Sequence, residues 1–281
     1  MLGGLGAAVL WASATLASSR AGRLIGPSAT VAWMMLVGVV VAAPLAFASG
    51  SAPAMTPDVL AWMLGSGTGG VAGLMLVYRG LQLGKVGVVA ALASTEGAIA
   101  AVISVVAGEP ITLPIAATLV VIAGGIAWVA FATDSPGKPN ASGDPTRAAL
   151  FGAAAALCFG LSIYSTARLG AYMSPLMAVL PVRVVGVLSV SVPLALAGRL
   201  RLTRRALPMV VWIGVAEVFG NASYVVGSRQ SIAIAAILAS QFAAVAAIAA
   251  FVIFRERLSR RQLSGVVAIA IGVATLALVR S

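Results

Sequence analysis

The sequence predicts an all-α polytopic membrane protein, with ten transmembrane helices arranged as two inverted five-helix repeats. Composition is the first reason: 61% of the residues are hydrophobic, 9% are charged and the mean hydropathy is +1.08, whereas soluble domains are about 25% charged. The second reason is length, because the chain divides into ten apolar runs close to the ~20 residues that cross a bilayer. The third is an ordered series of residues that recurs in the second half.

Charged residues, glycine and proline separate the ten apolar runs. We expect helices at residues 2–18, 28–47, 59–77, 86–107, 111–132, 147–166, 175–197, 206–226, 231–254 and 262–279. Residues 133–146, TDSPGKPNASGDPT, form the one long hydrophilic connection, and such a composition is typical of a flexible linker. The predicted organisation is therefore a first repeat over residues 1–135, a linker over 136–146 and a second repeat over 147–281.

Residues of the two halves match in order at a nearly constant spacing. The matches are Gly4 with Gly152, Arg20 with Arg168, Pro27 with Pro175, Gly38 with Gly186, Tyr78 with Tyr224, and Leu92-Ala93-Ser94 with Leu238-Ala239-Ser240. An odd number of helices per repeat makes the second copy enter the membrane from the opposite side. Inverted repeats place a substrate site at mid-depth between the halves and permit alternating access.

Basic residues are unequally divided between the two sides of the predicted membrane. The odd-numbered loops hold Arg20, Arg23, Arg79, Lys85, Lys138, Arg147, Arg199, Arg201, Arg204, Arg205, Arg255, Arg257, Arg260 and Arg261; the other side holds Arg168, Arg229 and Arg280. The positive-inside rule places the odd loops in the cytoplasm and both termini outside. The net charge of +11 is thus a feature of topology and of contact with anionic lipid headgroups, rather than of nucleic-acid binding.

The residue inventory excludes several classes of chemistry. The chain has no histidine and one cysteine, Cys158, so metalloprotease motifs, Ser–His–Asp triads and intrachain disulfides are excluded. No GxxxxGK[ST] loop encodes an ATP motor. We therefore expect no enzyme activity, no cofactor and no metal, and any driving energy must come from a gradient or from the transported compound.

Two of the seven acidic residues, Glu96 and Glu217, lie near the middle of apolar runs. A carboxylate at membrane depth is costly unless it faces a cavity, a partner or a proton, so it indicates a functional site. Each could accept a proton or bind a cation. The alternative for each is a structural carboxyl that is held neutral or hydrogen-bonded to a neighbouring helix.

The run that contains Glu217 carries a polar stripe. Glu217, Asn221 and Tyr224 stand at i, i+4 and i+7 and share one helix face, and Ser228 extends it. The stripe predicts a substrate-facing or proton-binding surface, with hydrogen bonding between helices as the alternative.

Arg183 is the one basic residue well inside a predicted span. It has three alternatives: an ion pair with Glu217 or Glu96, contact with an anionic group of the cargo, or extension to the headgroups. Gln241, at the repeat position of Thr95 or Glu96, together with Trp11 and Tyr164, could add hydrogen bonds or aromatic walls. Packing is the commoner role of such residues.

At this point the chain resembles the drug/metabolite transporter superfamily, in its ten-helix, two-repeat EamA-type branch. The resemblance rests on Leu10-Trp11-Ala12-Ser13, on Leu92-Ala93-Ser94-Thr95-Glu96, and on the junctions Gly108-Glu109-Pro110-Ile111-Thr112 and Arg255-Glu256-Arg257-Leu258-Ser259. Gly97 and Ala243 stand where the family often has proline, which weakens any inference about kinks there. The resemblance implies a secondary carrier, commonly drawn with both termini in the cytoplasm, opposite to the charge count.

We therefore expect a multi-pass protein of the cytoplasmic membrane that exports a small metabolite, amino acid or drug-like compound by alternating access, in a proton-coupled or exchange-driven cycle. A passive channel or a non-transporting scaffold is the alternative. The expected partners are a small-molecule substrate, membrane lipids and protons, in a monomer or homodimer. Two acids and one buried arginine suit a zwitterion; if Arg183 neutralises one acid, the remaining acid suits a cation.

Overall fold

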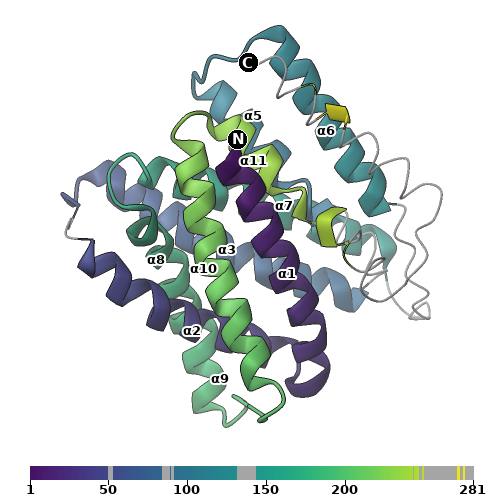
Figure 1. Cartoon of the computed structure of the whole chain (residues 1–281). Coiled ribbons are helices and arrows are strands. Elements are labelled where there is room, and N and C mark those ends of the chain that lie inside the picture. The colour runs from purple at the N-terminus through teal and green to yellow at the C-terminus, as the bar shows by residue number, and fades with distance from the viewer. Residues whose placement is uncertain are drawn as a thin grey trace.

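The fold was taken from a computed structural model (Figure 1), and all its regular elements over the described residues are helical. The structure describes residues 1–49, 53–83, 89, 92–131, 144–242, 244–246, 249, 271–272 and 275. Residues 136–143 of the predicted linker, the junction at 255–259 and Ala243 lie outside this set.

The first half contains α1 (Leu2–Ile25), α2 (Pro27–Ala48), α3 (Pro57–Leu83), α5 (Glu96–Val106) and α6 (Leu113–Phe131). Gly26 separates α1 from α2 with a φ of 88°, a conformation that favours glycine. Pro27 then begins α2 at a position where no backbone N–H is needed. The adjacent residues Gly26 and Pro27 therefore end α1 and begin α2.

The second half contains α7 (Pro145–Leu169), α8 (Pro175–Gly186), the π-helical turn η1 (Val187–Ser191), α9 (Val192–Leu196), α10 (Leu207–Ser228) and α11 (Ile232–Ala239). Side chains of Asp144, Ser174 and Ser231 accept backbone hydrogen bonds at the starts of α7, α8 and α11. The π turn precedes Pro193, whose ring nitrogen cannot donate to the preceding turn.

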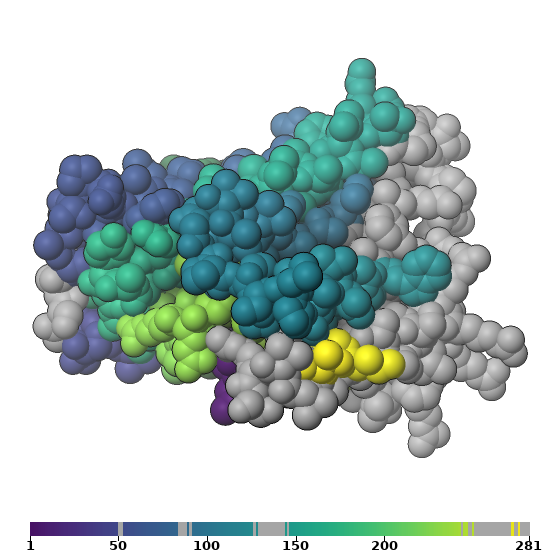
Figure 2. Space-filling model, turned by 90° about the horizontal axis from the view of Figure 1, so that it is seen from above, coloured from purple at the N-terminus to yellow at the C-terminus, as the bar shows by residue number. Residues whose placement is uncertain are grey.

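Six of the described helices are long and apolar enough to cross a membrane: α1, α2, α3, α7, the continuous α8–α9 segment and α10. Most of them extend a few residues beyond the predicted runs. Of the predicted last helix, residues 271, 272 and 275 are described, and they are helical. They lie beside α6 (Figure 2), where a Cβ added to Gly272 would come within 2.5 Å of Ile122.

Helices from the two halves pack against each other. α1 lies against α10 and α11, α3 and α5 lie against α7, α2 lies against α8, and α5 lies against α11. Gly65, Gly69 and Gly73 make the α3–α7 approach possible, because a Cβ at any of them would overlap Ser165, Cys158 or Phe159. This is the small-residue packing that membrane helices use.

The predicted fourth and ninth helices are both interrupted. A turn at Ser94 and Thr95 precedes α5, and a turn at Ser240 and Gln241 follows α11. Hydroxyl groups at both breaks donate to carbonyls of the preceding turn, Thr95 Oγ1 to Leu92 O at 2.7 Å and Ser240 Oγ to Ile237 O at 3.0 Å. The expectation of continuous helices over 86–107 and 231–254 was thus wrong, because the breaks form without proline.

Candidate functional site

A cavity of about 230 Å³ lies among α1, α2, α3, α5, α7, α8 and α10. Its lining includes five of the eight residues predicted from the sequence: Trp11, Glu96, Arg183, Glu217 and Asn221. Phe159, Phe242, Met34, Met35 and Ile163 supply apolar walls. An apolar cavity with a few convergent polar groups is the usual form of a small-molecule site.

Arg183 and Glu217 form an ion pair across the cavity wall. Arg183 Nη2 donates to Glu217 Oε2 at 3.1 Å, and the two side chains are 2% and 24% exposed. Asn221 Nδ2 donates to Glu217 O at 2.8 Å and is 3.4 Å from Oε2. Of the three alternatives for Arg183, the structure therefore shows pairing with Glu217.

Glycine creates the space that Arg183 occupies. A Cβ added to Gly38 on α2 would lie 2.8 Å from Arg183 Cδ. Arg183 Nη1 reaches Met35 Sδ, one turn earlier on α2, at 3.7 Å. The guanidinium is therefore held against α2 while it neutralises a carboxylate on α10.

Glu96 is the first residue of α5, directly after the break at Ser94 and Thr95. A helix N-terminus stabilises a negative charge. Gly160 on α7 lets that helix approach, since a Cβ there would lie 3.1 Å from Glu96 O. Among the described residues, the Glu96 carboxylate has no hydrogen-bond or ion-pair partner, so the cavity has one more carboxylate than guanidinium.

Trp11 lies on the wall of the cavity, and its ring makes a T-shaped contact with Phe242 at a centroid distance of 6.2 Å. It is 8% exposed, and its Nε1 has no hydrogen-bond acceptor among the described residues. Arg183 Nε is likewise buried, and no described residue accepts a hydrogen bond from it. Both N–H groups lie against glycines of neighbouring helices, since a Cβ added to Gly220 would be 2.7 Å from Trp11 Nε1 and one added to Gly38 would be 3.3 Å from Arg183 Nε.

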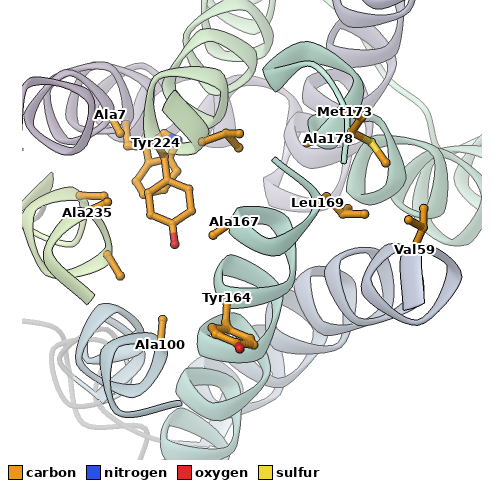
Figure 3. Close-up of a cluster of buried hydrophobic side chains, with 14 residues drawn as sticks. Ala7, Val59, Ala100, Tyr164, Ala167, Leu169, Met173, Ala178, Tyr224 and Ala235 are labelled. Carbon is orange, nitrogen blue, oxygen red and sulfur yellow. The ribbon is translucent and has the colours of Figure 1, made fainter. Parts of the chain in front are cut away.

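Three predicted residues do not line the cavity. Tyr224 is fully buried, and its hydroxyl donates to Ile163 O at 3.3 Å. Tyr164 packs edge-on against Trp62 at a centroid distance of 5.7 Å. Both belong to a buried cluster that joins α1, α5, α7, α10 and α11 (Figure 3). Gln241 is 5% exposed in the second break, and its Nε2 has no partner among the described residues.

The sequence reasoning did not assign two of the residues that build this region. Phe159 lines the cavity, and its spacing of 148 from Trp11 was the signal that could have found it. Glu109 caps α11: its carboxylate accepts from Ile232 N at 3.1 Å, Ala233 N at 3.3 Å and Ser231 Oγ. The sequence placed Glu109 in a junction that resembles the family's, but it did not indicate that Glu109 binds the start of α11.

Comparison with known proteins decides the family. The model of the EamA-like transporter family matches residues 1–131 and 146–278. The chain belongs to the EamA-like transporter family. Its members are membrane proteins that transport small solutes, and the apolar helices of this chain agree with that placement.

A solved structure, titled only as the crystal structure of a protein, has a similar fold. Its TM-score is 0.78 at 18% sequence identity, and the match covers 99% of this EamA-like chain and 96% of the other. At that identity the likeness concerns the fold alone. No curated protein matches the sequence.

Proposed function

We propose that this EamA-like protein is a secondary carrier in which Glu96 binds a proton and a positively charged group of the cargo in turn. The observation that carries the proposal is the difference between the two cavity carboxylates. Glu217 is neutralised by Arg183 at 3.1 Å, whereas Glu96 has no partner among the described residues. An intramembrane carboxylate without a counter-ion needs a proton or a cation, so of the two cargo types left open, a cation is favoured at this site.

We further propose ten helices in two inverted repeats, over residues 1–135 and 147–281, joined by a linker at 136–146. The two separate family matches, one in each half, support this division. Contacts between the halves support it as well. Gly4 lies against Ala235 and Leu238, and its counterpart Gly152 lies against Val89 and Leu92. At a spacing of 146, Val89 is the counterpart of Ala235 and Leu92 is the counterpart of Leu238.

The same exchange of partners occurs around the cavity. Gly38 lies against Arg183, and Gly186 lies against Met35; both pairs of counterparts are 148 residues apart. Trp11 meets Gly220, and Phe159, which stands at the Trp11 position of the second half, meets Gly73. A pseudo-two-fold axis that relates these contacts passes through the cavity. This is where inverted-repeat carriers bind cargo and alternate its access.

We propose the orientation that the loop charges favour, with both termini outside the cytoplasm and the protein in the cytoplasmic membrane. Export then moves cargo from the face with the basic loops to the face with the N-terminus. In this cycle Glu96 releases cargo when it takes up a proton from outside, and it returns to the cytoplasmic face protonated.

The test is flux in proteoliposomes under an imposed pH gradient, with a panel of organic cations, amines, amino acids and neutral drugs. We expect saturable, gradient-driven flux of at least one amine-bearing compound. Glu96→Gln should reduce this flux to the level of protein-free liposomes, because the amide neither ionises nor takes up a proton. Asp58→Asn, which changes an exposed carboxyl at the start of α3, is the matched control and should transport like wild type.

Counterflow separates a carrier from the passive channel considered above. Preloading the vesicles with unlabelled cargo should accelerate entry of labelled cargo in wild type and not in a channel. Transport by Glu96→Gln at the wild-type rate, with the same response to the pH gradient, would contradict the proposal. So would the absence of saturable flux of every panel compound in a folded wild-type protein.

A further inference from the structure

A second cavity, of about 730 Å³, lies where α7 and α10 end. Arg168, Arg229, Ser174, Ser228 and Tyr172 contribute its polar lining. An adjoining cavity of about 300 Å³ shares Arg168, Ser228 and Arg229 and is also lined by Glu109. We call the two together the arginine vestibule. It lies on the side of the N-terminus, because Ser223 Oγ near the end of α10 donates to Gly3 O at 2.9 Å.

Neither arginine of the vestibule forms an ion pair with a described residue. Arg229 Nε donates to Gly170 O at 3.3 Å and Nη2 to Met173 O at 3.4 Å, which fixes the guanidinium at the α7–α8 connection. Arg168 stacks on Trp62 at 5.5 Å, and its buried Nε has no acceptor in the part of the chain that the structure describes. Glu109 is engaged at the start of α11. The vestibule is thus lined by two guanidiniums and by one carboxylate that already accepts three hydrogen bonds, which leaves an excess of positive charge.

The position of these arginines in the sequence strengthens the argument. Seventeen basic residues lie outside the span of Arg183, and only Arg168, Arg229 and Arg280 lie on the side of the N-terminus by the helix count. Two of these three line the same cavity. The positive-inside bias disfavours basic residues on this face, so topology alone does not explain their convergence.

The vestibule stands in line with the central cavity along two helices. On α10, Glu217 and Asn221 line the cavity, Tyr224 lies in the buried cluster, and Ser228 lines the vestibule. On α7, Ile163 lines the central cavity, Tyr164 lies in the buried cluster, and Arg168 lines the vestibule. A helix rises about 1.5 Å per residue, so Asn221 and Arg229 are roughly 12 Å apart along the axis. The polar stripe on α10 therefore runs from one cavity to the other, past Tyr224 in the buried cluster of Figure 3.

We propose that the arginine vestibule is an oxyanion-binding site, which takes a carboxylate or phosphate group at the outer end of this path. Guanidinium groups bind these oxyanions through charge-assisted hydrogen bonds of matching planar geometry. Ser174 and Ser228 line the same space. The site goes beyond the proposed carrier function, since it uses none of the residues around Glu96.

The experiment measures anion binding to the full chain in nanodiscs of phosphatidylcholine, at constant ionic strength with chloride as the exchanged ion. Acetate, inorganic phosphate and glycerol 3-phosphate are the probes. Trp62 lies under Arg168, so its fluorescence, obtained by difference from Trp62→Phe, reports on the site. We expect saturable binding of at least one oxyanion, with a Kd raised about tenfold or more in Arg168→Gln and less in Arg168→Lys.

Arg204→Gln, which changes an exposed arginine before α10, is the matched control and should leave the Kd unchanged. Glu96→Gln should bind the oxyanion with the wild-type Kd. The outcome of this experiment is therefore independent of whether the carrier proposal holds. If phosphatidylglycerol nanodiscs abolish the response to soluble anions, the occupant is a lipid headgroup; if they do not, it is a soluble oxyanion. No saturable response in wild type, or an equal Kd in a folded Arg168→Gln protein, overturns the proposal.

Discussion

Replacing Arg183 with methionine is expected to be the most destabilising single change in the central cavity, by about 3–5 kcal/mol in the free energy of unfolding. The Arg183 side chain is 2% exposed and donates to Glu217 Oε2 at 3.1 Å. Its loss leaves a carboxylate at membrane depth without its guanidinium. Methionine fills part of the space against Gly38 and Met35, so the lost charge, rather than a void, dominates. Unfolding in detergent, followed by helicity, measures the effect.

The double variant Arg183→Met with Glu217→Gln separates the loss of pairing from a loss of packing. It should be more stable than Arg183→Met alone, because no unpaired charge remains. Arg199→Met, which changes an exposed arginine after α9, should leave stability nearly unchanged. A double variant as unstable as Arg183→Met alone would mean that the ion pair is not what stabilises this region.

Gly97→Ala is expected to have the second-largest effect on stability, because the added methyl group would push α5 away from α11. A Cβ at Gly97 would lie 2.4 Å from both Ala236 O and Ser240 Oγ, and the carbonyl belongs to a backbone that cannot rotate away. Overpacking of this kind costs about 1–3 kcal/mol. Since Glu96 is the neighbouring residue, displacement of α5 should also reduce gradient-driven flux. Thermal unfolding and the proteoliposome assay measure the two effects.

Gly124→Ala in α6 is the matched control, because a Cβ there meets nothing within 4 Å. It should be neutral or stabilising by up to about 1 kcal/mol, as alanine is the better helix former. If Gly97→Ala proves as stable and as active as Gly124→Ala, the interrupted helices do not depend on this close contact.

The sequence was sufficient to predict an all-helical membrane protein and five of the residues that line the central cavity. Periodicity was not needed for this, since long apolar runs and their charged boundaries indicate membrane helices directly. Glu96, Glu217 and Arg183 stood out because charges are rare at membrane depth. The rarity of charges identifies these residues but does not tell which of them lie close together. The partner of Arg183 therefore became known only from the structure, in which α8 and α10 lie beside each other.

The interruptions at Ser94–Thr95 and Ser240–Gln241 were beyond the sequence for a different reason. No proline marks them, and serine and threonine inside apolar runs are compatible with a continuous helix. Their hydroxyls instead bond to carbonyls of the preceding turn, which competes with the helical ladder. Tyr224 was assigned to the site from a shared helix face, and a helix face does not reveal the depth at which the cavity ends.

Proton release on cargo binding tests the central claim most directly. The claim is that Glu96 holds either a proton or the cargo. With a compound that the panel shows to be transported, binding to detergent-solubilised wild type in weakly buffered solution should release about one proton per bound molecule, and its affinity should rise with pH, by at most about tenfold per pH unit. Glu96→Gln should release none. Wild-type binding without proton release, or equal release by Glu96→Gln, would contradict the account.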